Sequence, residues 1–181
     1  MKKYSLFFYC VLFICVLNAQ QNNEKKDQII TSYNYTTIDR ESVGPWHLFT
    51  LGYLKEFDSI TLIPKLNMAE RRSNGAHLIS GIQAELDAYF KGKNHYQNFN
   101  FAYSGAEIFQ EIRAFYSYYQ SYKNATEIEY GARYVKTANT NIIGGVLGYT
   151  KYIGNYYINC RGFAQFEQGK LNPAIASNLR Y

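Results

Sequence analysis

Few side chains in this sequence have the type and spacing that catalysis or metal binding requires. Three histidines are available, at His47, His77 and His95. They lack the spacing of metal ligands. His77 with Ser80 or Asp87 is the only candidate for an activated nucleophile, and no Gly-x-Ser-x-Gly turn supports it. Cys160 lies alone among apolar residues of its segment. We therefore expect no catalytic residue, no metal site and no cofactor.

A second set of residues is notable because charges alternate with apolar side chains. Within 126–135, Glu127, Glu129 and Arg133 share one parity, whereas Ile128 and Tyr130 share the other. Side chains of a β-strand alternate between its two faces, so this segment has a charged face and an apolar face. Across all segments, the same parity argument selects five acids and five bases: Lys65, Arg71, Glu85, Asp87, Glu111, Arg113, Glu127, Glu129, Arg133 and Arg161.

These ten charges point into an interior if the apolar faces meet lipid. Unpaired charges in a narrow interior are costly, so a balanced set most simply predicts a neutral ion-pair network. The alternative is a polar passage that selects a solute or an ion. About ten strands enclose little more than their own side chains, which argues against a wide pore.

Strand-like segments rich in Tyr, Phe, Ile, Val and Thr fill the chain from Ile29 onward, separated by Gly, Asn, Asp, Ser or Lys clusters. We expect ten strands, at 29–38, 46–57, 59–71, 75–90, 95–104, 111–122, 125–136, 141–151, 154–167 and 175–181. Most are long enough for the roughly 9–11 residues that a tilted strand needs to cross a bilayer.

Tyrosine content distinguishes a membrane barrel from its rival, a secreted soluble β-sandwich. The chain of 181 residues has 19 Tyr and 12 Phe, and the tyrosines crowd the apolar faces near strand ends. Aromatic residues collect in this way at membrane interfaces. The even strand number and the alternation of longer with shorter connections also fit a bacterial barrel. We therefore predict an all-β, antiparallel up-and-down transmembrane β-barrel.

The N-terminus has the layout of a secretory signal peptide. Lys2 and Lys3 precede an apolar run from Leu6 to Leu17, which at 12 residues is too short to span a bilayer as a helix. We expect a signal peptide at 1–19, a short polar segment at 20–28 and the barrel domain at 29–181. Cleavage leaves Cys160 as the only thiol, so no internal disulfide is expected. The basic residues are interspersed with acids, which argues against binding nucleic acid.

Several strand sequences resemble the YaiO-family outer-membrane β-barrel. The resemblance rests on four stretches, GIQAELDAY (81–89), FAYS (101–104), EYGARY (129–134) and GY…GNY (148–156), and covers roughly residues 30–181. It implies a closed barrel in the outer membrane of a Gram-negative envelope, with outer-membrane lipid as its surroundings. It implies no catalytic residues.

The C-terminal segment 175–181 ends in Tyr181 and resembles the terminal strand that the outer-membrane assembly machinery recognises. Its seven residues are short for a crossing strand, which favours a chain shortened at its C-terminus over a natural ten-strand barrel. The predicted role is structural or binding in the cell envelope. A narrow channel for a small solute or ion is the alternative, and a lipid-modifying barrel enzyme is a distant third.

Overall fold

The computed structural model describes residues 27–37, 44–73 and 76–181, and all of its regular structure is β-strand. The predicted signal peptide at 1–19 and most of the polar segment at 20–28 lie outside the described residues. The ten strands are β1 (Gln28–Thr36), β2 (Trp46–Glu56), β3 (Ile60–Ser73), β4 (Ala76–Lys91), β5 (His95–Tyr103), β6 (Ile112–Tyr122), β7 (Thr126–Lys136), β8 (Asn141–Ile153), β9 (Tyr156–Glu167) and β10 (Lys170–Arg180).

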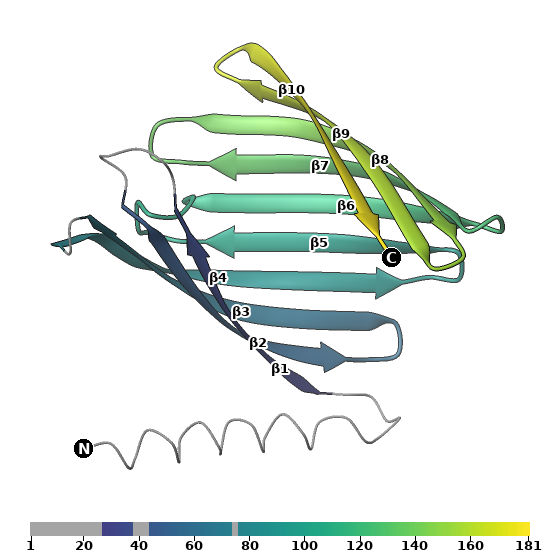
Figure 1. The fold of residues 1–181 in the computed structure, drawn as a ribbon, viewed down its shortest axis with the longest axis horizontal. Helices are drawn as coiled ribbons and strands as arrows, with labels where there is room; N and C mark the ends of the chain where they lie inside the picture. Colours follow the sequence, from purple (N-terminus) through teal and green to yellow (C-terminus); the bar gives the residue numbers. More distant parts are fainter. Residues whose placement is uncertain (1–26, 38–43, 74–75) are drawn as a thin grey trace.

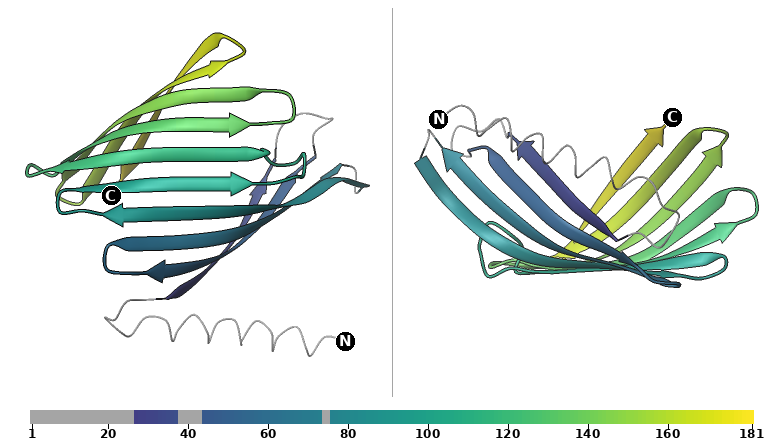
Figure 2. Two further views of the ribbon diagram at one scale, coloured as in Figure 1. Left: turned by 180° about the vertical axis from the view of Figure 1, so that it is seen from behind. Right: turned by 90° about the horizontal axis from the view of Figure 1, so that it is seen from below.

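Each strand pairs antiparallel with the next one in the sequence, which makes a single up-and-down sheet of ten strands (Figure 1). This confirms the predicted fold class. The sheet is strongly curved into a trough, with β1 and β10 on its two arms (Figure 2). In the described part of the chain the sheet is open between these two strands. Among the same residues, no helix is long and apolar enough to cross a membrane.

Burial is inverted relative to a soluble protein. Eleven polar or charged residues are buried, against four hydrophobic ones, among the residues that the structure describes. On β4, Gln83 is 2% exposed, whereas its neighbour Ile82 is 58% exposed. The polar parity therefore faces the concave side of the trough, and the apolar parity faces outward, as lipid contact requires.

The two ends of the sheet differ in their connections. At the end where β1 begins, which we call the turn end, the strands are joined through 57–59, 92–94, 123–125 and 154–155. At the opposite end, which we call the loop end, the connections are 37–45, 74–75, 104–111, 137–140 and 168–169. The longest connections therefore all lie at one end, which is the asymmetry of outer-membrane barrels.

The last strand begins earlier than the sequence predicts. β10 has eleven residues, so the expectation of a seven-residue terminal strand at 175–181 is wrong. The added part of the strand contains Pro173, which has no N–H for a sheet ladder but pairs with Ala164 on an edge strand, where proline is tolerated. The turn before β10 is only Gln168 and Gly169, both with positive φ.

Candidate functional site

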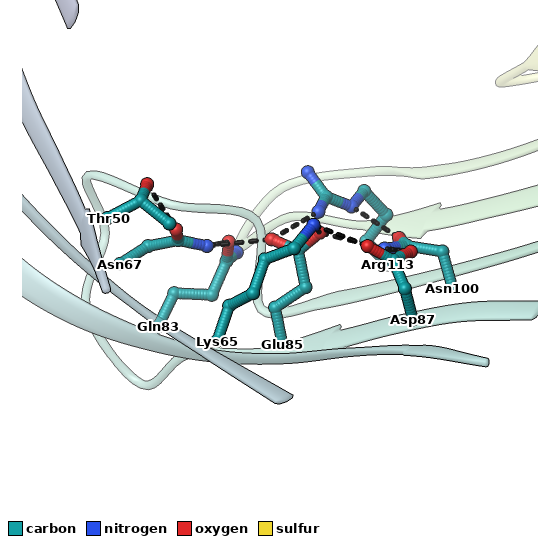
Figure 3. A network of polar contacts seen from close by, with 8 residues as sticks. All are labelled: Thr50, Lys65, Asn67, Gln83, Glu85, Asp87, Asn100 and Arg113. Carbon is teal, nitrogen blue, oxygen red and sulfur yellow. Dashed lines mark hydrogen bonds and ion pairs between the residues drawn. The ribbon is translucent and has the colours of Figure 1, made fainter. Parts of the chain in front are cut away.

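A first cluster of charges lies on the concave face across β3, β4 and β6. Lys65 Nζ lies 3.3 Å from Glu85 Oε1 and also contacts the Asp87 carboxylate. Arg113 Nη2 lies 2.9 Å from Glu85 Oε2. The cluster has two cations and two anions, so its formal charge is zero. We call these four residues the first cluster (Figure 3).

Neutral polar side chains complete the first cluster. Asn67 Nδ2 donates to Glu85 Oε2 at 2.7 Å, and its Oδ1 accepts a hydrogen bond from Thr50 Oγ1 at 2.7 Å. Asn100 Nδ2 donates to both Glu85 Oε1 (2.8 Å) and Asp87 Oδ1 (2.7 Å), and Asn100 Oδ1 accepts from Arg113 Nε at 3.1 Å. These bonds satisfy lone pairs that ion pairing leaves over, which is what a buried ion pair needs to be tolerated. Asn67 and Asn100 are not among the ten residues predicted from the sequence, although both have the parity of the charged residues.

A second cluster lies on β7 and β9 and is built on one buried carboxylate. Glu129 is 2% exposed, and its Oε1 lies 3.1 Å from Arg133 Nη2, while its Oε2 lies 2.6 Å from Arg161 Nε. Ser117 Oγ donates to Glu129 Oε1 at 2.8 Å, and the Tyr119 hydroxyl donates to the same oxygen at 3.1 Å. We call Glu129, Arg133 and Arg161 the second cluster.

A glycine makes room for the second cluster. A Cβ at Gly148, which pairs with Glu129 across β7 and β8, would lie 2.9 Å from Glu129 Oε2. The carboxylate therefore reaches Arg161 over a position where only glycine fits without a shift.

One aromatic ring lies between the two clusters. The Phe115 ring has the Arg133 guanidinium 4.8 Å from its centroid and the Arg113 guanidinium 5.6 Å away. Both distances are within the range of cation–π attraction. The Phe115 ring therefore interacts with one arginine from each cluster. Through this ring the two clusters, which share no ion pair, form one row of interacting side chains from β3 to β9.

The remaining three predicted charges lie outside both clusters. Arg71 lies over the ring of Trp46, 5.1 Å from its centroid. Glu111 pairs with Lys136 at 2.6 Å near the loop end, where both side chains are more than a third exposed. Glu127 accepts a hydrogen bond from the Tyr96 hydroxyl at 3.1 Å. The structure thus gathers seven of the ten predicted residues into two clusters and gives the other three separate partners.

The connection 104–111 folds over the concave face at the loop end. Ser104 Oγ donates to the Ile82 carbonyl at 2.7 Å, which turns the chain inward as β5 ends. A Cβ at Gly81 would lie 2.3 Å from Ala106 Cβ and 2.8 Å from Ile108, so the connection packs directly on this glycine. Its Phe109 ring meets Trp46 edge-on, with centroids 6.4 Å apart. Residues 104–111 therefore cover the part of β4 that β5 does not reach.

Comparison with known families agrees with this geometry. Residues 26–181 match the model of the YaiO membrane beta barrel domain. The chain belongs to this family. No curated protein sequence and no solved structure matches it. The YaiO family membership, the inverted burial and the up-and-down topology make this an outer-membrane β-barrel protein.

The histidines and the cysteine of this YaiO-family chain do not converge. His47 Nδ1 lies 2.7 Å from the Tyr33 hydroxyl, His95 stacks on Tyr118 with ring centroids 5.4 Å apart, and Cys160 is exposed. His77 pairs with Arg72 and Ser80 with Glu70, and in the described part of the chain no hydrogen bond joins His77 to Ser80. Asp87 lies ten residues farther along β4, roughly 34 Å away in an extended strand. Within the described ranges, no group of three His, Cys, Asp or Glu residues could hold a metal ion.

Proposed function

We propose that the protein is a non-conducting outer-membrane barrel with a structural or binding role in the cell envelope. The observation that supports this role most directly is the pairing of the concave face. The charges of the first cluster balance within the cluster, and the buried Glu129 carboxylate is shared by two arginines. A passage for ions needs side chains that exchange partners with a moving solute, whereas these side chains are held by one another.

The covered loop end supports the same role. The connection 104–111 packs on Gly81 and against Trp46, so it narrows the concave space at that end. We also propose an orientation: the turn end, with its short connections, faces the periplasm, and the loop end faces the outside. Outer-membrane lipid would contact the outward apolar face, and the outer-membrane assembly machinery would insert the chain.

Planar-bilayer recording of the refolded, full-length protein tests the non-conducting role. We expect no stable unitary currents, with a general porin reconstituted in parallel as a positive control. Stable unitary currents would support the narrow channel instead. In that case Arg133→Glu should change the ion selectivity, because it reverses a charge on the concave face, whereas Lys170→Glu at the loop-end turn is the matched control.

Cell fractionation tests location and export separately from conductance. We expect the protein in the outer-membrane fraction after an alkaline carbonate wash, with a mature N-terminus at Gln20 by mass spectrometry. Release by carbonate would contradict integration into the membrane. A mature protein that retains residues 1–19 would contradict the proposed signal peptide.

A further inference from the structure

The concave face contains a cavity at the turn end that the two charge clusters do not fill. It has a volume of about 860 Å³ and lies between residues near the ends of β2, β4 and β6 and residues near the starts of β3 and β5. This volume is within the roughly 300–1,000 Å³ of small-molecule sites. The cavity is separate from the first cluster, because Lys65, Glu85 and Asp87 do not line it.

The wall of this cavity is mostly apolar and aromatic. Leu54, Ile63, Tyr89 and Tyr96 line it. Tyr96 is fixed in place by stacking on Tyr119, with ring centroids 4.3 Å apart, and by its hydrogen bond to Glu127. An apolar surface on the otherwise polar concave face is an exception to the pattern of the sheet. It suits the hydrocarbon part of a ligand rather than an ion.

The ladder between β2 and β3 is interrupted beside this wall. Gly52 pairs with Lys65 and Lys55 pairs with Leu62 in the same register, but Tyr53 and Leu54 between them form no ladder pair with β3. Pro64 lies in this gap and has no N–H to donate. Its pairing with Leu86 on β4 continues, so the interruption affects only the β2 side, where Leu54 and Ile63 line the cavity.

Three lysines surround the entrance to the cavity. Lys91 is paired with Glu56, at 2.5 Å. Lys93 and Lys123 are exposed, line the cavity and form no hydrogen bond or ion pair with any residue in the described part of the chain. The entrance therefore has two cations that no acid of the described residues neutralises, in contrast to the paired charges of the first cluster.

Hydrogen bonds between neighbouring connections hold these lysines at one entrance. The carbonyl of Asn94, next to Lys93, accepts from Ser121 N at 2.9 Å and from Gln120 Nε2 at 2.9 Å. Lys91 N donates to the Ser59 carbonyl at 2.8 Å, which joins β4 to the preceding turn. The connections at 57–59 and 92–94 and the end of β6 are thus tied together, so the cationic entrance is part of the fold.

We propose that this cavity binds a single-chain anionic amphiphile, in which a phosphate or carboxylate group contacts Lys93 and Lys123 and a short hydrocarbon chain lies against Leu54, Ile63 and Tyr89. Lysine ammonium groups supply charge-assisted hydrogen bonds to such an anion. The cavity opens on the concave face rather than on the lipid-facing side, so the ligand enters from the aqueous compartment at the turn end. The inference deepens the binding role proposed above.

Calorimetric titration with hexyl phosphate tests this site, using the full chain refolded in a non-ionic detergent. We expect saturable binding that weakens about tenfold or more in the double variant Lys93→Gln/Lys123→Gln, because two charge-assisted contacts are lost. The matched control is Lys136→Gln/Lys170→Gln, which removes the same charge at the loop end and should bind like the wild type. Gel migration is compared between heated and unheated samples of each variant, and a shift on heating verifies that the variant is folded.

Four further ligands identify which part of the amphiphile is recognised. Butyl phosphate should bind about fifteenfold more weakly than hexyl phosphate, since it lacks two methylenes and each buried methylene contributes about fourfold in affinity. Inorganic phosphate and 1-hexanol should each bind much more weakly than the joined molecule. Equal binding of hexyltrimethylammonium would overturn the proposal, as would wild-type affinity in Lys93→Gln/Lys123→Gln.

A two-tailed ligand distinguishes a lipid headgroup from a single-chain amphiphile. Dihexanoylphosphatidylglycerol should bind no more tightly than hexyl phosphate, and tighter binding that displaces hexyl phosphate would overturn the single-chain assignment. These outcomes are independent of the bilayer recordings. A protein that conducts can still bind hexyl phosphate, and a silent protein can fail to bind it, so the two proposals fail separately.

Discussion

The middle of the concave face and its turn-end entrance use charged residues in opposite ways. In the middle, Glu129 is 2% exposed and shared by two arginines, and Glu85 lies between Arg113 and Lys65. At the entrance, Lys93 and Lys123 are exposed around an apolar cavity and have no partner among the described residues. The difference indicates that the buried charges in the middle are all paired, whereas two exposed charges at the entrance are left unpaired within the described part of the chain.

The contrast indicates that the buried charges matter for the stability of the fold, whereas the exposed charges are available for recognition of a ligand. A charge buried in the middle must be paired, because an uncompensated ion in a low-dielectric interior costs several kcal/mol. A charge at the entrance is hydrated, so it can remain unpaired at little cost and stay free to meet a ligand. Substitutions in the two regions should therefore differ in which property they change.

The largest effect is expected from Glu129→Gln, which leaves Arg133 and Arg161 without their carboxylate. Removing one member of a buried ion pair costs about 3–5 kcal/mol, and we expect a loss of about 3 kcal/mol in the free energy of unfolding. Urea unfolding of protein folded in lipid vesicles, followed by tyrosine fluorescence, measures it.

The entrance supplies the control for this substitution. Lys93→Gln should change the free energy of unfolding by no more than about 0.5 kcal/mol, as expected for an exposed residue. Similar losses in Glu129→Gln and Lys93→Gln would abolish the distinction between the two regions.

A double-mutant cycle on Glu85 and Arg113 gives the next largest effect. Glu85→Gln leaves Arg113 without its carboxylate, and Arg113→Met leaves Glu85 with only the longer 3.3 Å contact to Lys65, whereas the double variant removes both charges. We expect the double variant to lose less stability than the sum of the single losses, with a coupling of about 2 kcal/mol. The same urea assay applies. Additive losses would mean that the 2.9 Å contact contributes nothing to folding.

A substitution at Gly81 tests whether the connection 104–111 is held in place by its packing on β4. Gly81→Ala places a methyl group 2.3 Å from Ala106 Cβ, so the connection 104–111 must shift, at a cost of about 1 kcal/mol. A glutamate-specific protease should then cleave faster after Glu107, which is exposed in this connection. Gly145→Ala is the control, because its nearest neighbour is a carbonyl 3.7 Å away. Equal cleavage rates in the two variants would show that residues 104–111 do not depend on Gly81.

The sequence predicted the strands and their two faces well, because the alternation of period two depends only on local parity. It could not predict that Arg113 on β6 meets Glu85 on β4, since that contact depends on the register of β5 and on the curvature of the sheet. The packing of 104–111 on Gly81 was missed for a similar reason. The sequence prediction placed 168–174 in a connection and so missed the first residues of β10, which include a proline that an edge strand tolerates.

The smallest effect is expected from a solvent-exposed ion pair at the turn end. Asp27 Oδ2 accepts hydrogen bonds from Lys55 Nζ at 2.8 Å and from the Tyr53 hydroxyl at 2.6 Å. The bond from Lys55, and then that from Tyr53, lowers the pKa of Asp27 below its ordinary value of 3.8. Exposed pairs of this kind contribute little, so Asp27→Asn should shift the urea midpoint much less than Glu129→Gln.

The pH dependence of the Asp27→Asn effect identifies its origin. Because folding lowers the pKa of Asp27, the carboxylate stabilises the protein fully above the unfolded-state pKa, and this contribution is lost as the pH falls through the folded-state pKa. The difference in urea midpoint between wild type and Asp27→Asn should therefore be constant above about pH 5 and should narrow below about pH 4. A difference that stays constant on acidification would mean that the carboxylate charge at the turn end has no part in holding the start of β1 against β2.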